Sequence, residues 1–460
     1  MTERLADLTA VELIARYRDG SLSPVEVLED VLARVDSLEP KLCALYAPDP
    51  TAARAAARDS EYRWRTGEPA GPLDGVPVTV KENIATRGTP VPQGTAAADL
   101  TPATEDAPAA ARLRASGAVI FSKTTMPEYG MLSSGVSTFH HLSRNPWDPA
   151  RTPGGSSAGA GAAAAAGYGP IHLGTDIGGS IRLPAGWCGV VGLKPTHGRV
   201  AVGNPYPGRA IGPLARTAAD AALALTVISG PDRRDYTSLP RVPDSYSPSV
   251  DPQGLRIGLL LDAGLGLPVD PEVSAAVSAA AALLEKAGAI VEPIPPIITR
   301  EMLDGLDHFW RVRSAYDINA LPEDRRLKVL PEIRRWVSTA SELTAFDVFH
   351  GYTQMHAMAV AVDNAFADYD FILSPVAPIT AFPAELAYPT DDPLKPFEHI
   401  AFTVPYNMST HPAATVNCGF SSTGLPIGLQ IAAPRFNDLA ALRLAAYVDA
   451  QTPHRPWPSI

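Results

Sequence analysis

Two short glycine-rich turns that end in serine are the stretches of this sequence with the clearest chemical potential. They read Gly154-Gly155-Ser156 and, 24 residues later, Gly178-Gly179-Ser180. Paired glycines permit positive φ angles and bring backbone N–H groups close to a bound atom. Such donors can hold the negative charge that develops on a carbonyl oxygen under nucleophilic attack. The pattern therefore indicates a serine nucleophile, with Ser180 as the candidate. The oxyanion donors would be the N–H groups of Ile177, Gly178, Gly179 and Ser180.

Other interpretations of these turns fit the sequence less well. A flexible linker does not explain the segment 157–166 between them, which is all Ala, Ser and Gly and is typical of a buried helix. A phosphate-binding loop requires Gly-Lys-Ser/Thr, which follows neither turn. The Gly-x-Ser-x-Gly elbow of the α/β-hydrolases is also missing at both serines. His172 and His197 are the nearest histidines, and a Ser-His-Asp triad assembled from distant positions stays open.

The segments around both turns resemble the amidase signature family of serine hydrolases. The resemblance lies in GGSSAGAG at 154–161 and in GTDIGGSIRLPAGWCGVVGLKPTHGRV at 174–200. It implies that Ser180 is the nucleophile and that Ser156 is a bridging serine that follows a cis peptide bond. The family's base is a lysine in a G-V-P-x-x-x-K-D/E pattern. Residues 75–83, GVPVTVKEN, match that pattern, so the base would be Lys81.

This Ser–Ser–Lys assignment requires a particular protonation state of the lysine. Serine at its ordinary pKa is a poor nucleophile and needs a base, so Lys81 must be neutral to accept a proton. Burial favours the neutral amine, because desolvation penalises the charged form. Ser156 would then relay protons between Ser180, Lys81 and the leaving nitrogen. The residues expected to support this triad are Thr175, Asp176, Arg182 and Ser157.

The elements that must position these residues alternate between strands and helices. A short apolar strand over 76–80 ends at Lys81, and a helix over 106–116 leads to a strand over 118–122. This β-α-β rhythm predicts a mixed sheet. The resemblance implies the same class, an α/β fold in which helices cover both faces of a large, twisted, mixed β-sheet. Further strands and helices are expected at 218–228, 255–260, 270–287, 289–292 and 369–375.

Length alone would allow two or three domains in 460 residues. We expect one amidase signature domain over 1–460, with its core motifs at 70–220. Matches to the family continue through 212–217, 369–375 and 424–430. The segment 300–363 matches no motif and is predicted to be a variable helical insertion. Its many aromatic residues are expected to be mostly core, with one or two lining a substrate entrance.

Composition limits the classes of partner. A net charge of −11, with no basic run, argues against nucleic acid or an anionic membrane surface as the main partner. Neither a signal peptide nor a run of 18 apolar residues is seen. Cys43, Cys188 and Cys418 are widely spaced, which favours reduced thiols in a cytoplasmic protein. We expect a monomer or homodimer that acts on a small molecule and uses no metal or organic cofactor.

The loops expected to wall the site suggest a neutral, largely apolar substrate. The loops 131–152, 203–209 and 397–411 supply aromatics, whereas their arginines are only Arg144, Arg151 and Arg209. A dicarboxylate or a phosphorylated substrate would lack a clamp. Among the aromatic residues that these loops bring are Phe139, Trp147, Tyr206, Phe402 and Tyr406. The predicted substrate-binding residues are Tyr129, Met131, Tyr206, Arg209 and Phe402.

The sequence thus predicts a hydrolase that cleaves an amide, anilide, carbamate (urethane) or ester bond through a Ser180 acyl-enzyme. Two alternatives remain. The glutaminase subunit of a tRNA-dependent amidotransferase shares the signature and works in a complex, although the segment 300–363 lacks the tyrosine-rich stretch associated with it. A catalytically dead, ligand-binding relative is the other alternative, and it would not need Lys81, Ser156 and Ser180 together.

Overall fold

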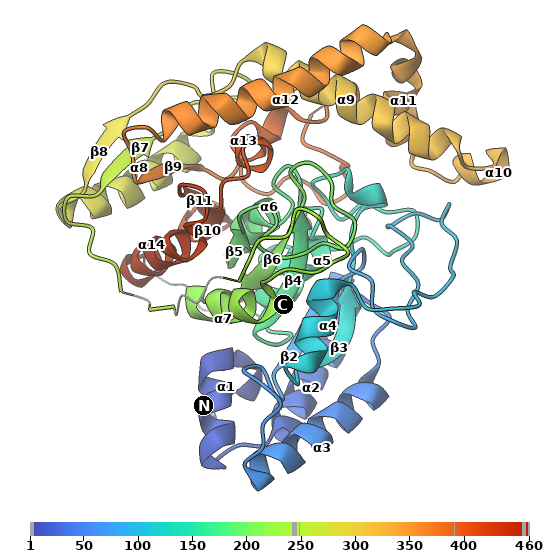
Figure 1. Cartoon of the computed structure of the whole chain (residues 1–460), viewed down its shortest axis with the longest axis vertical. Coiled ribbons are helices and arrows are strands. Elements are labelled where there is room, and N and C mark those ends of the chain that lie inside the picture. Colours follow the sequence, from blue (N-terminus) through green and yellow to red (C-terminus); the bar gives the residue numbers. More distant parts are fainter. Residues whose placement is uncertain (1–3, 242–245, 248, 391, 453–456, 459–460) are drawn as a thin grey trace.

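A single mixed sheet of eleven strands organises the computed structural model (Figure 1). The structure describes residues 4–241, 246–247, 249–390, 392–452 and 457–458. The strand order is β1-β3-β2-β4-β6-β5-β10-β11-β9-β7-β8, so the centre of the sheet combines segments from the whole chain. The strands are β1 Leu45–Tyr46, β2 Pro77–Lys81, β3 Val119–Thr124, β4 Ile171–Asp176, β5 Val191–Lys194, β6 Ala210–Ala215, β7 Arg256–Leu259, β8 Ile290–Pro293, β9 Phe371–Pro375, β10 Ala413–Phe420 and β11 Pro426–Ala432.

Helices cover both faces of this sheet, as the sequence predicted. The first face carries α4 Pro108–Ala115, α7 Ala218–Ile228, α8 Pro271–Lys286 and α14 Asp438–Gln451. The second face carries α5 Ala158–Ala166 and α6 Arg182–Cys188. Every residue of α5 is buried, and all of them are alanine or glycine. A helix without large side chains lets its backbone lie close to the strands, which brings the turns at its two ends into the sheet layer.

The N-terminal helices form a separate layer against α5 and β3. They are α1 Ala10–Asp19, α2 Pro24–Leu42 and α3 Pro50–Thr66. The side chains of Thr9 and Ser23 cap the first two helices, and Glu12 and Glu26 complete both capping boxes. The apolar face of α2, through Val27, Leu28 and Val31, is buried in this layer.

The segment 300–363 is helical, as predicted, and packs over the second face of the sheet (Figure 1). It contains α9 Arg300–Asn319, α10 Glu323–Arg326, α11 Pro331–Ser338 and α12 Ala345–Ala365. The long helices α9 and α12 cross at Gly305 and Gly351. A Cβ atom on Gly351 would lie 2.2 Å from the Gly305 carbonyl oxygen. The absence of both side chains therefore fixes how closely α9 lies against α12, and with it the side chains that α9 presents to the sheet.

Strand and helix predictions were accurate to within a few residues where the chain is described. The segment 231–252, which the sequence predicts to be an exposed connection rich in Pro, Asp and Ser, lies partly outside the described residues. None of the described helices is both long and apolar enough to cross a membrane. All three cysteines are free thiols.

Candidate active site

Two parallel strands bring the predicted base and its supports together. Strands β2 and β4 are neighbours, and Val80 lies opposite Leu173 in their register. Lys81 is the last residue of β2, and Thr175 and Asp176 end β4. The carboxyl ends of parallel strands meet at one edge of a sheet, which is where α/β folds place their sites. The prediction of a strand that ends at Lys81 is confirmed.

Three hydroxyl groups surround the amine of Lys81. Its Nζ atom lies 2.8 Å from Ser156 Oγ, 3.1 Å from Ser157 Oγ and 2.9 Å from Thr175 Oγ1. No carboxylate lies within ion-pair distance of this amine among the described residues. Lys81 has no exposed surface. The structure therefore brings together four of the residues that the sequence predicted as base, relay and support.

Burial lowers the pKa of Lys81 to about 7, while the charges of Asp176 and Glu82 oppose that shift. Burial also lowers the pKa of Lys123, to about 8, and that of Lys194, to about 7. These two lysines donate to backbone carbonyls, Lys123 to Ile84 and Lys194 to Pro195, and in the described part of the chain neither amine is hydrogen bonded to a serine. A lowered pKa is thus shared by three lysines, whereas contact with a serine hydroxyl distinguishes Lys81.

The second part of the site is the turn that contains Ser156 and Ser157. The peptide bond between Gly155 and Ser156 is cis, as the family resemblance implied. Ser157 connects this turn to β4, because its hydroxyl donates to the Thr175 carbonyl at 3.1 Å and accepts from the Thr175 N–H at 3.2 Å. The Ser157 N–H donates to the carbonyl of Ser180 at 3.1 Å. The two serine turns, 24 residues apart in the sequence, are therefore directly hydrogen bonded.

The turn that carries Ser180 runs from the end of β4 to the start of α6. Gly179 has a φ of 126°, which residues with a side chain rarely adopt. The carbonyl of Gly178 accepts from the Thr403 hydroxyl at 2.6 Å. The Gly179 N–H, one of the four predicted oxyanion donors, already donates to Asp176 at 2.8 Å. This corrects the prediction for Gly179, because its hydrogen is directed into the protein. Within the described residues, no acceptor is found for the N–H groups of Ile177, Gly178 and Ser180.

A buried ion pair between Asp176 and Arg182 holds this turn. Their side chains are fully buried and 2.9 Å apart. The Asp176 carboxylate also accepts from the N–H of Ile181 and from the Asn407 amide. Burial raises the pKa of Asp176, but Arg182 and these donors outweigh that effect and hold the pKa well below its usual range. Arg182 donates further to the Thr403 carbonyl and to Gln430. The pair therefore links β4 and α6 to the C-terminal segment.

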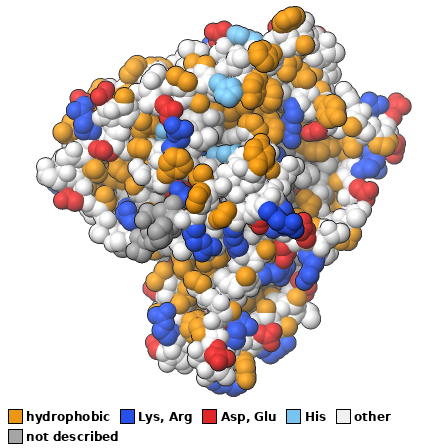
Figure 2. Space-filling model, viewed as in Figure 1, with side chains coloured by type: hydrophobic (Ala, Val, Ile, Leu, Met, Phe, Trp, Pro, Cys, Tyr) orange, Lys and Arg blue, Asp and Glu red, His pale blue; other side chains and the backbone are white. Residues whose placement is uncertain are grey.

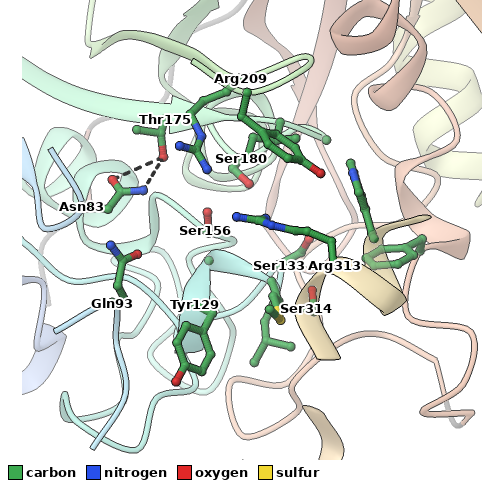
Figure 3. Close-up of a pocket in the computed structure, with 18 of the residues that line it drawn as sticks. Asn83, Gln93, Tyr129, Ser133, Ser156, Thr175, Ser180, Arg209, Arg313 and Ser314 are labelled. Carbon is green, nitrogen blue, oxygen red and sulfur yellow. Dashed lines mark hydrogen bonds between the residues drawn. The ribbon is translucent and has the colours of Figure 1, made fainter. Parts of the chain in front are cut away.

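A cavity of about 400 Å³ opens onto both serines. Ile177 and Gly178 also line the cavity. One end of the cavity contains Ser156, Thr175 and Ser180 (Figure 3). Asn83 lies beside this end, and both polar atoms of its amide face the Thr175 hydroxyl. The other walls come from the loops at 129–133 and 204–209, from α9, and from 397–400. A site of this size and shape suits a small organic molecule.

Comparison with known proteins agrees with this geometry. The family model described as Amidase matches residues 26–442. The chain belongs to the amidase signature family. It is 36% identical over 475 residues to the A-type subunit of the glutamyl-tRNA(Gln) amidotransferase of Chloroflexus aurantiacus, with 96% of each chain covered. Among solved structures, it resembles a bacterial aryl acylamidase (TM-score 0.88, 27% identity, 96% of each chain) and a 6-aminohexanoate cyclic dimer hydrolase (TM-score 0.88, 30% identity, 98% of each chain).

The amidase cavity contains four of the five predicted substrate-binding residues: Tyr129, Met131, Tyr206 and Arg209. The prediction that Phe402 binds substrate is wrong, because its side chain packs into a core cluster with Leu260 and Ile372 and is 1% exposed. Three other aromatics of the predicted wall loops also lie elsewhere. Tyr406 is buried, Phe139 packs against Tyr46, and Trp147 packs on Phe420.

Several lining residues were not predicted by the sequence. From α9 they are Trp310, Arg313, Ser314, Asp317 and Ile318, and from other segments Gln93 and Trp336. The predicted wall loop 397–411 does line the cavity, but through Phe397, His399 and Ile400, which the sequence did not single out. Trp310 and Trp336 agree with the expectation that one or two aromatics of 300–363 line an entrance. The spacing 310, 313, 314, 317 and 318 is that of one helix face, so periodicity could have indicated that these residues act together.

Two arginines change the expectation about substrate charge. Arg209 and Arg313 both line the cavity (Figure 3). Arg313 was not expected there, because it lies on a helix and not on a wall loop. The premise that the site lacks a clamp for an anion therefore does not hold in this amidase.

Histidines do not form a triad with Ser180 in the described residues. His399 lines the cavity, but neither of its ring nitrogens has a hydrogen-bond partner, and burial lowers its pKa to about 3. His172 is held in the core by Thr79 and by the carbonyl of Gly169. No group of three or more His, Cys, Asp or Glu side chains is arranged to hold a metal ion in the described part of the chain.

Proposed function

We propose that this chain hydrolyses the carbon–nitrogen bond of a carboxamide through an acyl-enzyme on Ser180. Lys81 would be the general base and Ser156 the proton relay. The observation that carries the proposal is the 2.8 Å contact between Lys81 Nζ and Ser156 Oγ at the edge of a cavity that also contains Ser180. The family membership supports the same chemistry.

The hydrogen bonds around Lys81 favour a neutral amine that accepts from Ser156. The Ser157 hydroxyl donates to the Thr175 carbonyl, and the Thr175 hydroxyl faces the carbonyl oxygen of the Asn83 amide at 3.4 Å. Both hydroxyl oxygens are therefore available as acceptors for the two N–H bonds of a neutral lysine. The lone pair of Nζ is then left for the third neighbour, the O–H of Ser156.

The reaction would proceed in two halves. Ser156 passes its proton to Lys81 and takes the proton of Ser180, whose Oγ attacks the carbonyl carbon. The oxyanion is stabilised by the N–H groups of Ile177, Gly178 and Ser180, which are fixed before the reaction begins. Ser156 then protonates the leaving nitrogen, with Lys81 returning the proton, and the amine departs. Water attacks the resulting ester along the same relay and releases the carboxylic acid.

Labelling with a serine-directed phosphonate tests the nucleophile. We expect one covalent adduct, which peptide mapping places on Ser180 and which Ser180→Ala abolishes. Ser422→Ala is a matched control, because Ser422 lies exposed between β10 and β11. An adduct that persists in Ser180→Ala, or amide turnover in that variant within tenfold of the parent, would reject the assignment.

In this proposal the chain cleaves carboxamides and also anilides, carbamates and esters. Trp310, Phe397, Ile400 and Met131 provide apolar walls for an aryl or alkyl group. A panel of matched primary amide, anilide, ester and carbamate substrates would rank these bonds by kcat/KM. The free thiols of Cys43, Cys188 and Cys418 support a cytoplasmic location for this activity.

A second candidate is supported by the relatives that are A-type subunits of glutamyl-tRNA(Gln) amidotransferases. In this alternative the chain releases ammonia from glutamine within a complex. Exposed apolar side chains on α12 support an additional partner: Phe346 is 87% exposed, Phe349 67% and Val360 59%. Figure 2 shows hydrophobic side chains gathered on the surface where α9 and α12 lie.

Turnover by the isolated chain separates the two candidates. A stand-alone amidase should elute in gel filtration as a monomer or homodimer and hydrolyse aryl or alkyl amides at full rate. A member of a complex should show a marked preference for glutamine, together with a low rate that rises when its partners are added.

A further inference from the structure

One aromatic ring in the cavity is shared by two guanidinium groups. The Arg313 guanidinium carbon lies 4.5 Å from the centre of the Tyr206 ring, and that of Arg209 lies 5.4 Å from it. Arg313 comes from α9, while Tyr206 and Arg209 come from the loop after β5. Figure 3 shows both arginine side chains pointing into the space that contains the hydroxyls of Ser156 and Ser180. Two segments about 100 residues apart thus build one basic wall.

The charges of this wall do not cancel. The only charged residues among the described lining are Arg209, Arg313 and Asp317. Arg313 has a partner, because Asp317 lies 3.4 Å away on the next turn of α9. The Arg209 side chain forms no ion pair within the described residues, and the one hydrogen bond found there for its guanidinium goes to the Asn204 carbonyl at 3.3 Å. The cavity therefore carries one net positive charge, located at Arg209.

The surroundings of Arg209 make that charge costly in the empty cavity. Burial lowers the pKa of Arg209, and the charge of Arg313 lowers it further. A half-buried cation without a counter-ion is unfavourable, and an anion bound beside it would remove part of that cost. The guanidinium fork matches a carboxylate in two parallel hydrogen bonds. A single net charge is neutralised by one carboxylate, whereas a phosphate dianion would leave an excess of negative charge.

We infer that Arg209, supported by Arg313, binds a carboxylate on the same molecule whose amide carbonyl is attacked by Ser180. The substrate class is therefore a monoanionic carboxylate-bearing amide, with its hydrocarbon part against Trp310 and Ile400. This inference rests on the proposed function for the reaction but not for the binding. It fits both candidate functions, since glutamine also carries a carboxylate.

Paired substrates test the inference. The monoamides of dicarboxylic acids with one to four methylene groups are compared with neutral amides of the same length, such as the monoamide of glutaric acid with pentanamide. The wild-type chain should favour the carboxylate member by kcat/KM at one or more lengths. Arg209→Gln should lower that preference by about 10- to 150-fold, the value of a hydrogen-bonded charge pair. Arg209→Lys should restore part of it.

Two further variants serve as controls. Arg256→Gln removes one positive charge from β7, where Arg256 pairs with Glu292 outside the cavity lining, and should not change the preference. The double variant Arg313→Gln/Asp317→Asn leaves the net charge of the cavity unchanged, so it should lower the preference less than Arg209→Gln does. An equal preference in Arg209→Gln and in the wild type, or a wild-type preference for the neutral amides, would overturn the inference.

Calorimetry on Ser180→Ala separates binding from catalysis. This variant should bind the preferred monoamide more tightly than its neutral partner, and adding Arg209→Gln should remove the difference. If no amide is turned over but this difference is seen, the proposed reaction fails and the carboxylate site stands. If amides are turned over and the difference is missing, the carboxylate site fails and the reaction stands.

Discussion

The pH dependence of the rate tests whether Lys81 is the base. With a pKa of about 7, half of Lys81 is neutral at pH 7. An ordinary lysine with a pKa near 10.4 would be only about 0.04% neutral there, so burial raises the available base by a factor of about 10³. For a neutral amide, kcat/KM should rise about tenfold per pH unit below about pH 6 and become level above about pH 8.

Two charged residues near Lys81 allow the rising limb of this pH profile to be moved in opposite directions. The charge of Glu82 raises the pKa of Lys81, and that of Arg209 lowers it. Glu82→Gln should therefore shift the rising limb to lower pH, and Arg209→Gln should shift it to higher pH. One unit charge about 10 Å away in a water-like dielectric gives about 0.3 pH unit, and a lower dielectric gives more.

The assay follows initial rates from about pH 5 to about pH 10 on an uncharged amide, in buffers of constant ionic strength. The midpoint of the limb is compared between variants, because substitution of Arg209 is also expected to change the height of the profile. Arg256→Gln again controls for a distant change of charge. A rate that falls between pH 6 and pH 9, or two variants that move the midpoint in the same direction, would refute a neutral Lys81 as the base.

Four substitutions give further predictions. Ser180→Ala should abolish turnover and keep the thermal unfolding midpoint within a few degrees, as calorimetry would check. Ser156→Ala should reduce kcat/KM by about 10²–10⁴, with water replacing part of the relay. A loss below tenfold would contradict the relay. Arg182→Met should destabilise the fold by about 3–5 kcal/mol in urea unfolding, because Asp176 is left buried without its partner. Lys81→Met should stabilise the fold more at pH 6 than at pH 9. The unfolded lysine binds a proton that the folded one gives up between about pH 7 and its ordinary pKa, so the penalty that the substitution removes is full below pH 7 and falls as pH rises.

The sequence predicted well which residues meet around Lys81 at one end of the cavity, because local chain chemistry determines that end. Glycine pairs, a strand that stops at Lys81 and an Ala/Gly helix each have a signature within ten residues of a reacting group. Lys81 and Ser156 are 75 residues apart in the sequence, yet the pairing of β2 with β4 and the packing of α5 bring their side chains into contact. Gly179 was the exception, since the direction of an N–H bond in a turn depends on the acceptor that folding supplies.

The substrate end was predicted poorly, because it is built by contacts between distant segments. Arg313 faces Tyr206 only because α9 packs over the sheet, and α9 is held there by its crossing with α12 at two glycines. Phe402 illustrates the opposite error. An apolar residue in a predicted wall loop was expected to face substrate, but the short helical turn at 398–400 and α13 Val404–Met408 direct it into the core.

The groups of the site whose positive charge is disfavoured by desolvation are the ones that the two proposals use. Asp176 and Arg182 are buried as a pair, so together they can hold the nucleophile turn without leaving an unpaired charge. The amine of Lys81 is buried and contacts three hydroxyls, and burial outweighs the charges of Asp176 and Glu82, so its proton is weakly held at neutral pH. Arg209 cannot respond by losing its proton, because a guanidinium stays charged in proteins. In the two proposals, desolvation thus has two consequences: the fully buried lysine would act as a base, and the half-buried arginine would favour an anion.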